Sequence, residues 1–232
     1  VAEGFERVGA EFSASSYRDM ALLQLRTLSQ PEYREQALTL FAEIAGQPAF
    51  SDEAWLRHQE ALRIGQRQRQ QSPSGRAGLK FYQNLYGSHP YANPLAGYAA
   101  SVERISPKAI KAFHSRYYTV GNAVLVLVGD IDRDQAERIA REMSSALLPG
   151  PAAEPLAMPI ALKRGQREHI EMPSQQTFVL LGELGLSRQD PDYFPLIVAN
   201  EILGGGGFGS VLTRELREKR GLTYSVTSQF VP

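Results

Sequence analysis

The sequence predicts an α+β fold divided into two domains, and three observations support this prediction. Strand-like and helix-like patterns are mixed along the 232 residues. Residues 123–128 form a continuous, valine-rich apolar run, which is typical of a fully buried strand. Four of the 14 prolines lie between residues 149 and 159, where they indicate a stiff, extended linker. We therefore expect a first domain over residues 1–148, a linker over 149–162, and the start of a second domain over 163–232.

The first domain opens with the end of an amphipathic helix, and the alternation over residues 9–28 predicts a β-hairpin. The helix starts that follow are recognisable because proline fits the first helical turn, and serine or aspartate caps it. We expect helices from Pro31, from Ser51 to about Gln71, through residues 79–85, from Ser106 to about Tyr118, and from Asp132 to about Leu148.

The second domain is expected to hold two strands and two helices in about 70 residues, too few to match the first domain, so it reads as truncated. The pattern predicts a strand at 176–181, a helix at 192–203, a glycine loop at 204–209, a helix at 211–219 and a strand at 222–230.

Composition excludes several classes of function. Twenty-five basic residues balance 25 acidic ones, so no overall field recruits nucleic acid. No apolar run reaches the ~20 residues needed to cross a bilayer. The absence of cysteine excludes disulfides and thiolate catalysis. The chain starts at Val1 inside a helix-like pattern, so we expect both ends to continue in a longer protein, with any signal peptide upstream.

Five landmarks occur in an order that resembles one half of an M16 (pitrilysin-like) zinc peptidase. They are a glycine-led hairpin strand, a Pro-x-Phe helix end, a His-Pro-Tyr loop, a strand followed by Gly-Asp, and a helix running into a Leu-Arg-Glu segment. In this sequence they are residues 8–15, 48–50, 89–91, 128–130 and 202–224.

The resemblance implies paired α+β domains, each with a curved, mostly antiparallel sheet and helices packed on one face, enclosing a chamber between two halves. Arg217 precedes Tyr224 by seven residues across Gly221, as in the family's arginine–tyrosine pair that grips the backbone of a peptide substrate. The alternative for these two residues is an exposed helix arginine and an aromatic packed in a sheet.

The family's zinc motif, His-x-x-Glu-His, is missing. Histidines at i and i+4 share one helix face and can bind one ion, with the glutamate activating water. Here no histidine has another within five residues, so we expect a structural or solvent-facing role for all of them. They are His58, His89, His114 and His169.

The family's third zinc ligand, a downstream glutamate, should fall near residues 62–66, which hold no acidic residue. Glu60 is the nearest carboxylate, about one turn early, and is either a ligand or a plain exposed glutamate. The arginines that follow it are poor neighbours for a cation. We therefore expect no catalytic residue and no metal ligand in this chain, with zinc held by a partner subunit or, under the alternative, through residues upstream of Val1.

Three further patterns were weighed. Gly204-x-Gly206-x-x-Gly209 follows a helix without a βαβ unit, so a dinucleotide site is rejected in favour of a turn. Ser210 lacks the Gly-x-Ser-x-Gly context of a nucleophile elbow. The loop containing His89 is either a binding loop or a rigid turn.

The resemblance favours a noncatalytic subunit or half that binds peptide through Arg217 and Tyr224 and completes the chamber of a zinc-bearing M16 partner or a homodimer mate. The alternatives are an active zinc endopeptidase whose histidine motif lies upstream, and a structural subunit like some relatives in respiratory complexes. Neither nucleic acid nor a membrane span enters the expectation, and only the family analogy favours the periplasm.

Overall fold

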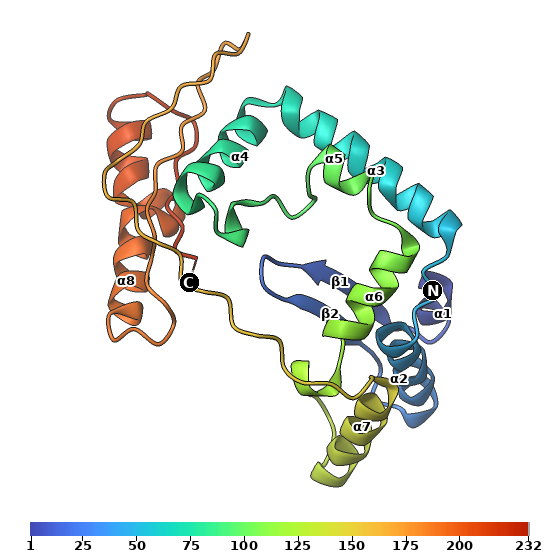
Figure 1. Ribbon diagram of the computed structural model, residues 1–232. Coiled ribbons are helices and arrows are strands. Elements are labelled where there is room, and N and C mark those ends of the chain that lie inside the picture. Colours follow the sequence, from blue (N-terminus) through green and yellow to red (C-terminus); the bar gives the residue numbers. More distant parts are fainter. Residues whose placement is uncertain (232) are drawn as a thin grey trace. The chain divides into compact units, whose positions relative to one another are not determined.

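The computed structural model describes residues 1–231, and its internal contacts divide the chain into two units, Val1–Leu180 and the residues from Leu181 onward. The elements are labelled in Figure 1. Those of the first unit are α1 (Ala2–Glu6), β1 (Glu11–Ser16), β2 (Ala21–Arg26), α2 (Pro31–Gly46), α3 (Asp52–Gln71), α4 (Pro73–Tyr86), η1 (Pro90–Ala92), α5 (Ala99–Val102), α6 (Pro107–Tyr117), η2 (Val120–Asn122) and α7 (Arg133–Ala146).

The predicted hairpin is confirmed. Strands β1 and β2 pair antiparallel, with Phe12 opposite Leu25. The ring of Phe12 stacks on that of Phe5 at 5.1 Å between centroids and meets Phe41 of α2 edge-on at 6.0 Å. Phe5 is only 2% exposed, so this aromatic contact is the centre of the first core, in which α1, the hairpin and α2 bury one another's apolar side chains.

The predicted helix starts are also confirmed. Pro31 occupies the first turn of α2, where a missing N–H costs nothing. At four other starts a side-chain oxygen accepts a backbone N–H at the third residue of the helix, which satisfies a donor that would otherwise lack a partner. These capping residues are Ser51, Ser72, Ser106 and Asp132. The start at Ser72 was not predicted: the helical stretch was expected over residues 79–85, and α4 begins six residues earlier, at Pro73.

Helix α7 packs against α2 and forms a second core (Figure 1). Ile139 and Met143 on α7 bury against Leu38, and the partly buried Leu127 joins them. Because Asp132 and Gln135 form a reciprocal capping box just before this contact, the start of α7 and its apolar face are fixed together.

The expected fully buried strand at residues 123–128 is not found. Val124 and Val128 are 92% and 93% exposed, and only Leu127 reaches a core. A strand forms only where a neighbour receives its N–H and C=O groups, and β1–β2 is the one ladder among residues 1–231. The segments expected as strands at 176–181 and 222–230 lack a ladder for the same reason. The α+β class stands, with a small antiparallel sheet among many helices.

The His-Pro-Tyr loop is a rigid turn bound to the tip of the hairpin. His89 Nδ1 accepts the N–H of Tyr91 at 3.2 Å. The guanidinium of Arg18 donates to the carbonyls of Tyr91 and Asn93, and it lies 3.8 Å from the ring centroid of Tyr82. Tyr91 in turn donates its hydroxyl to Asp19 at 2.7 Å. The arrangement matches the rigid-turn alternative.

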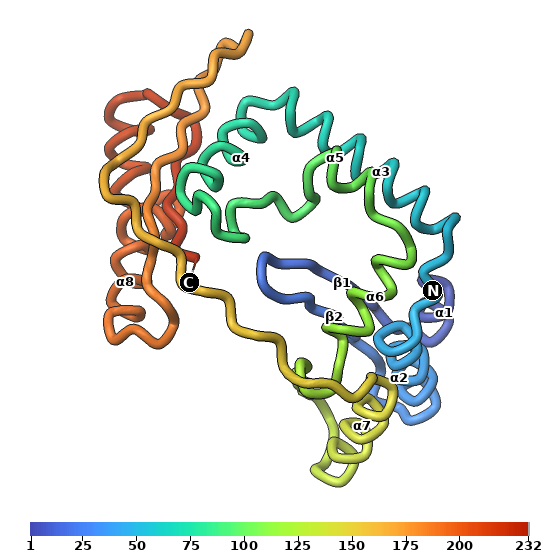
Figure 2. Tube along the Cα trace, viewed as in Figure 1, coloured from blue at the N-terminus to red at the C-terminus, as the bar shows by residue number. Residues whose placement is uncertain are grey.

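The proline-rich linker is extended but held at intervals (Figure 2). Asn122 accepts the N–H of Ala153 at 2.8 Å, and His89 Nε2 lies 2.8 Å from the carbonyl of Ala157. Further along, Glu168 pairs with Asn84 and Lys80 of α4 at 2.8 and 3.1 Å, and these bonds lower the pKa of Glu168. The contacts place the whole linker in the first unit, and a domain boundary at residues 149–162 remains a prediction.

Limited trypsin digestion should cut first after Lys163 or Arg164. Both are exposed, and they lie between the contacts made by Ala157 and Glu168. The backbone there is extended, so it can enter the active site of a protease. We expect an N-terminal fragment ending near residue 164 that resists further digestion, identified by mass spectrometry. A first cut inside α3, whose arginines are helical, would contradict this reading of the linker.

Tyr91 should ionise at a higher pH than tyrosines that lack a carboxylate partner. The hydrogen bond to Asp19, followed by burial, raises the pKa of Tyr91 to about 12. Since the folded value exceeds the ordinary value of about 10, the stabilisation is complete below pH ~10 and is lost as the pH rises toward 12. Ultraviolet titration should show this late step, and Asp19→Ala should lower it, while Asp130→Ala leaves it in place. An unchanged titration in Asp19→Ala would rule out this bond.

Candidate functional site

The four histidines lie apart, and three of them have a hydrogen-bond or ion-pair partner. His114 is buried, with Nε2 2.9 Å from the carbonyl of Ala45 and its ring stacked on Tyr118. His169 pairs with Glu171 at 2.8 Å. The remaining two belong to the rigid turn and to α3, namely His89 and His58.

Glu60 lies on α3 and forms an ion pair with Arg63 at 3.9 Å. Among residues 1–231, no three side chains of histidine, aspartate or glutamate come together as a metal site would require. A carboxylate paired with arginine, without a second ligand, has poor chemistry for zinc. The residues present therefore do not fit a zinc ion.

None of the helices within this described range is long and apolar enough to cross a membrane.

The second unit contains helix α8 (Tyr193–Asn200), the π-helical segments η3 (Glu201–Gly205) and η5 (Thr213–Glu218), and the short turn η4 (Gly207–Gly209). The two helices were predicted, but their wider π turns were not. In η5, for example, the N–H of Lys219 bonds to the carbonyl of Arg214, five residues back. A π turn changes which side chains share a face, and such turns are frequent at functional sites.

Ser210 starts the second of these helices. Its Oγ accepts the N–H of Thr213 at 3.3 Å and donates to the Thr213 hydroxyl at 3.0 Å. Ser210 is 1% exposed, so its hydroxyl serves as a cap and is out of reach of a substrate. This agrees with the missing nucleophile elbow.

Gly221 ends that helix. Its φ of +61° is left-handed, and its N–H bonds to the carbonyl of Arg217 at 3.0 Å. The N–H of Leu222 bonds to Leu216 at 2.9 Å. Glycine adopts this conformation without the steric cost other residues meet, so the chain can reverse here. The reversal directs the following segment back along the last helical turn.

As a result, Arg217 and Tyr224 come together. The guanidinium carbon of Arg217 lies over the ring of Tyr224, 4.8 Å from its centroid. It also lies 5.1 Å from the centroid of Phe208 in the glycine loop. Phe208 was not among the predicted site residues, and its one signal in the sequence is its place within Gly-Phe-Gly, ahead of the capping serine.

The two aromatic rings around Arg217 are exposed, and the arginine between them is partly buried. Tyr224 is 84% exposed and Phe208 is 76% exposed, while Arg217 is partly buried. The neighbouring Glu215 forms ion pairs with Lys219 at 2.7 Å and with Arg214 at 3.6 Å. The hydrogen bond from Lys219 lowers the pKa of Glu215. Within the described chain Arg217 has no carboxylate partner. Its N–H groups and the Tyr224 hydroxyl are therefore available to an acceptor on a ligand.

The glycine loop is shaped by close packing. A side chain at Gly204 would lie 2.5 Å from the backbone nitrogen of Ser228 and 2.8 Å from Leu212. Gly207 has a φ of +62°. These glycines let the loop turn tightly against the last segment of the chain, which fits a turn and not a dinucleotide site.

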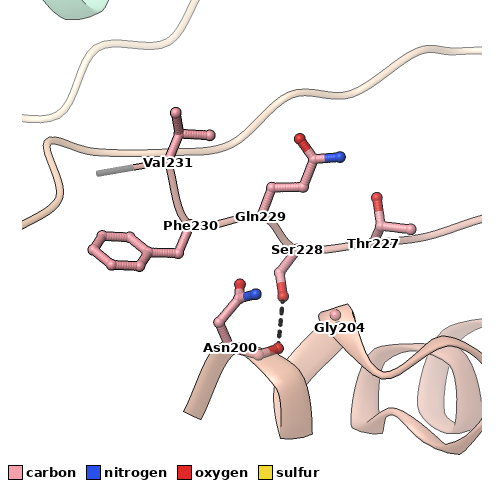
Figure 3. Close-up of a pocket in the computed structure, with 8 residues that line it drawn as sticks. Asn200, Gly204, Thr227, Ser228, Gln229, Phe230 and Val231 are labelled. Carbon is pink, nitrogen blue, oxygen red and sulfur yellow. Dashed lines mark hydrogen bonds between the residues drawn. The ribbon is translucent and has the colours of Figure 1, made fainter. Parts of the chain in front are cut away.

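A pocket of about 400 Å³ lies beside this packing point (Figure 3). Ser228 donates its hydroxyl to the carbonyl of Asn200 at 3.2 Å across the pocket floor. The described lining holds amides, hydroxyls and apolar groups but no titratable side chain, so it suits binding and not proton transfer. The lining residues are Asn200, Gly204, Gly205 and Thr227 to Val231.

Comparison with known proteins shows which family this chain resembles. The family described as peptidase M16 inactive domain matches residues 104–232. The crystal structure of a peptidase M16 inactive domain from Pseudomonas fluorescens is 43% identical, with a TM-score of 0.93, and the match covers 100% of this chain and 56% of that one. An uncharacterised zinc protease of Rickettsia felis is 26% identical, over 98% of this chain and 54% of its own length.

A non-peptidase homolog of Helicobacter pylori is 26% identical over 88% of this chain and 47% of its own length. The chain thus spans about half the length of the curated relatives it matches. More than half of its residues fall within the family match. The chain therefore belongs to the peptidase M16 family, and residues 104–232 match its inactive domain.

Proposed function

We propose that this chain is a noncatalytic half or subunit of an M16 peptidase, which binds the peptide substrate through Arg217 and Tyr224 and completes the chamber of a zinc-bearing partner. The observation that carries the proposal is the 4.8 Å contact between Arg217 and the exposed ring of Tyr224. The absence of a metal cluster from residues 1–231 and the match to the inactive domain support it.

The chemistry of the pair suits a peptide backbone. Arginine presents five N–H donors in a planar fork, which can bind two carbonyl oxygens at once. The Tyr224 hydroxyl adds one donor beside them. Zinc held by a partner would supply an activated water, and the Arg217 and Tyr224 donors, aimed at the carbonyl oxygen where negative charge develops, would stabilise the transition state.

The alternative is an active zinc endopeptidase in which the metal motif lies outside these residues. The name of the Rickettsia felis relative, an uncharacterised zinc protease about twice as long as the match, favours it. The name of the Helicobacter pylori relative, a non-peptidase homolog, favours the noncatalytic reading. A purely structural subunit is the third candidate, and it predicts that Arg217 has no effect on peptide hydrolysis.

Arg217→Ala should lower peptidase activity by roughly 10²–10³ when the chain is combined with its zinc-bearing partner, the scale for losing one transition-state donor. Tyr224→Phe removes a single hydroxyl and should cost less. The measurement is the rate of cleavage of a fluorogenic peptide by the reconstituted pair.

The matched control is Arg220→Ala, which removes a nearby exposed arginine of the same charge and should leave the rate within about twofold. Thermal unfolding of Arg217→Ala should stay close to that of the parent chain, because the side chain has no ion-pair partner among the described residues and contacts two rings that are themselves largely exposed. A normal rate in Arg217→Ala, or a loss of rate that follows a loss of folding, would favour the structural subunit.

The purified chain should hold far less than one zinc per molecule after dialysis, because Glu60 pairs with Arg63 and the histidines lie apart. Metal analysis by mass spectrometry checks this, with Glu60→Gln as the diagnostic variant. About one zinc per chain, lost on Glu60→Gln, would show that the chain carries a metal site and would support the active endopeptidase.

A further inference from the structure

Phe208 is a large apolar ring held in a position that folding does not require. It lies in η4 (Gly207–Gly209) and is 76% exposed, so it contributes little to a core. Its ring faces the guanidinium of Arg217, whose central carbon lies 5.1 Å from the ring centroid. An exposed aromatic in a loop of glycines points to a role outside packing.

The position of Phe208 is coupled to the helix that carries Arg217. The carbonyl of Gly207 accepts the hydroxyl of Thr213 at 3.1 Å and the N–H of Ser210 at 3.2 Å. Thr213 is 6% exposed and belongs to the same helix as Arg217. The turn that presents Phe208 is therefore tied to the first turn of that helix, and the ring and the guanidinium are set in one local frame.

The guanidinium of Arg217 meets two rings, those of Phe208 and Tyr224, at 5.1 and 4.8 Å. Aromatic rings attract a guanidinium through their negatively polarised faces. This contact leaves the N–H edges of arginine free as donors while it restricts the rotamers of a long side chain. A side chain restricted before binding loses less freedom when a ligand arrives, which improves affinity without a new contact.

We infer that Phe208 is a positioning residue for peptide binding, which acts through Arg217 by holding its guanidinium ready to donate to main-chain carbonyl oxygens. This inference rests on the proposed function. The ligand chemistry is a set of main-chain carbonyl oxygens on one side of an extended peptide, where alternate residues point the same way. A terminal carboxylate also offers oxygen acceptors to a guanidinium, and the experiment separates the two sources.

The test measures the binding of a fluorescein-labelled ten-residue Ala/Ser/Gln peptide to the full chain by anisotropy. One form has both ends blocked and the other has a free C-terminal carboxylate. Phe208→Leu should weaken binding of the blocked form by about 2- to 30-fold, the range that one cation–π contact spans between exposed and desolvated sites. Phe208→Trp should restore most of it. The matched control is Phe194→Leu, an equally exposed phenylalanine of α8, which should change nothing.

A second readout does not depend on binding. The Nε–H resonance of Arg217 in the free chain should shift when Phe208→Leu removes the ring current, with an unchanged thermal midpoint. In an Arg217→Ala background, Phe208→Leu should add no further loss of affinity, as expected for two residues that act as one unit.

The outcomes separate the inference from the proposed function. If Arg217→Ala abolishes binding while Phe208→Leu changes neither affinity nor the Nε–H signal, the inference is wrong and the proposed function stands. An equal effect of Phe208→Leu with and without Arg217 would mean that the ring touches the peptide directly, which overturns the positioning role. Binding confined to the free carboxylate form would overturn the carbonyl assignment. Unchanged binding in Arg217→Ala would remove the proposed function, and the inference with it.

Discussion

The left-handed turn at Gly221 is the constraint on which the candidate site depends. With φ at +61° and its N–H bonded to the carbonyl of Arg217, this residue ends the helix within one residue and reverses the chain. Only this reversal lets Tyr224, seven positions along the sequence, return to the Arg217 guanidinium at 4.8 Å. A side chain with a Cβ meets steric cost there, so the pair and the turn are one structural feature.

Local chemistry made part of this structure predictable. The cap residues Ser51, Ser106 and Asp132 act over a few bonds, so the sequence alone located three helix starts. The spacing of Arg217 and Tyr224 across a glycine indicated the pair. Phe208 was missed because its partner follows from the loop path, and the π turn of η5 was missed because its hydrogen bonds depend on packing and not on residue type. Residues 123–128 show a different error. Their apolar composition predicted a buried strand, but no neighbouring strand in the described chain pairs with them and most of their side chains are exposed.

The histidines show why residue identity alone is weak evidence for a metal centre. His89 fixes a turn and lies against the linker, and His114 fills an aromatic core contact beside Tyr118. Each ring nitrogen bonded to the backbone is unavailable as a ligand without breaking a local structure. Two of the four imidazoles, those of His89 and His114, therefore serve local structure.

The exposure of Tyr224 bears on how strongly the pair binds. In water, a charged donor such as Arg217 exchanges one hydrogen bond for another, so its gain from a peptide carbonyl is modest, though measurable, in the chain alone. The same donor gains far more once a chamber closes and excludes solvent, because the effective dielectric falls. Under the proposed function, Tyr224 is 84% exposed in this chain and would become covered when the partner closes the chamber. The aromatic contacts to Arg217 hold the geometry meanwhile, so that closure strengthens the donors without first having to order them.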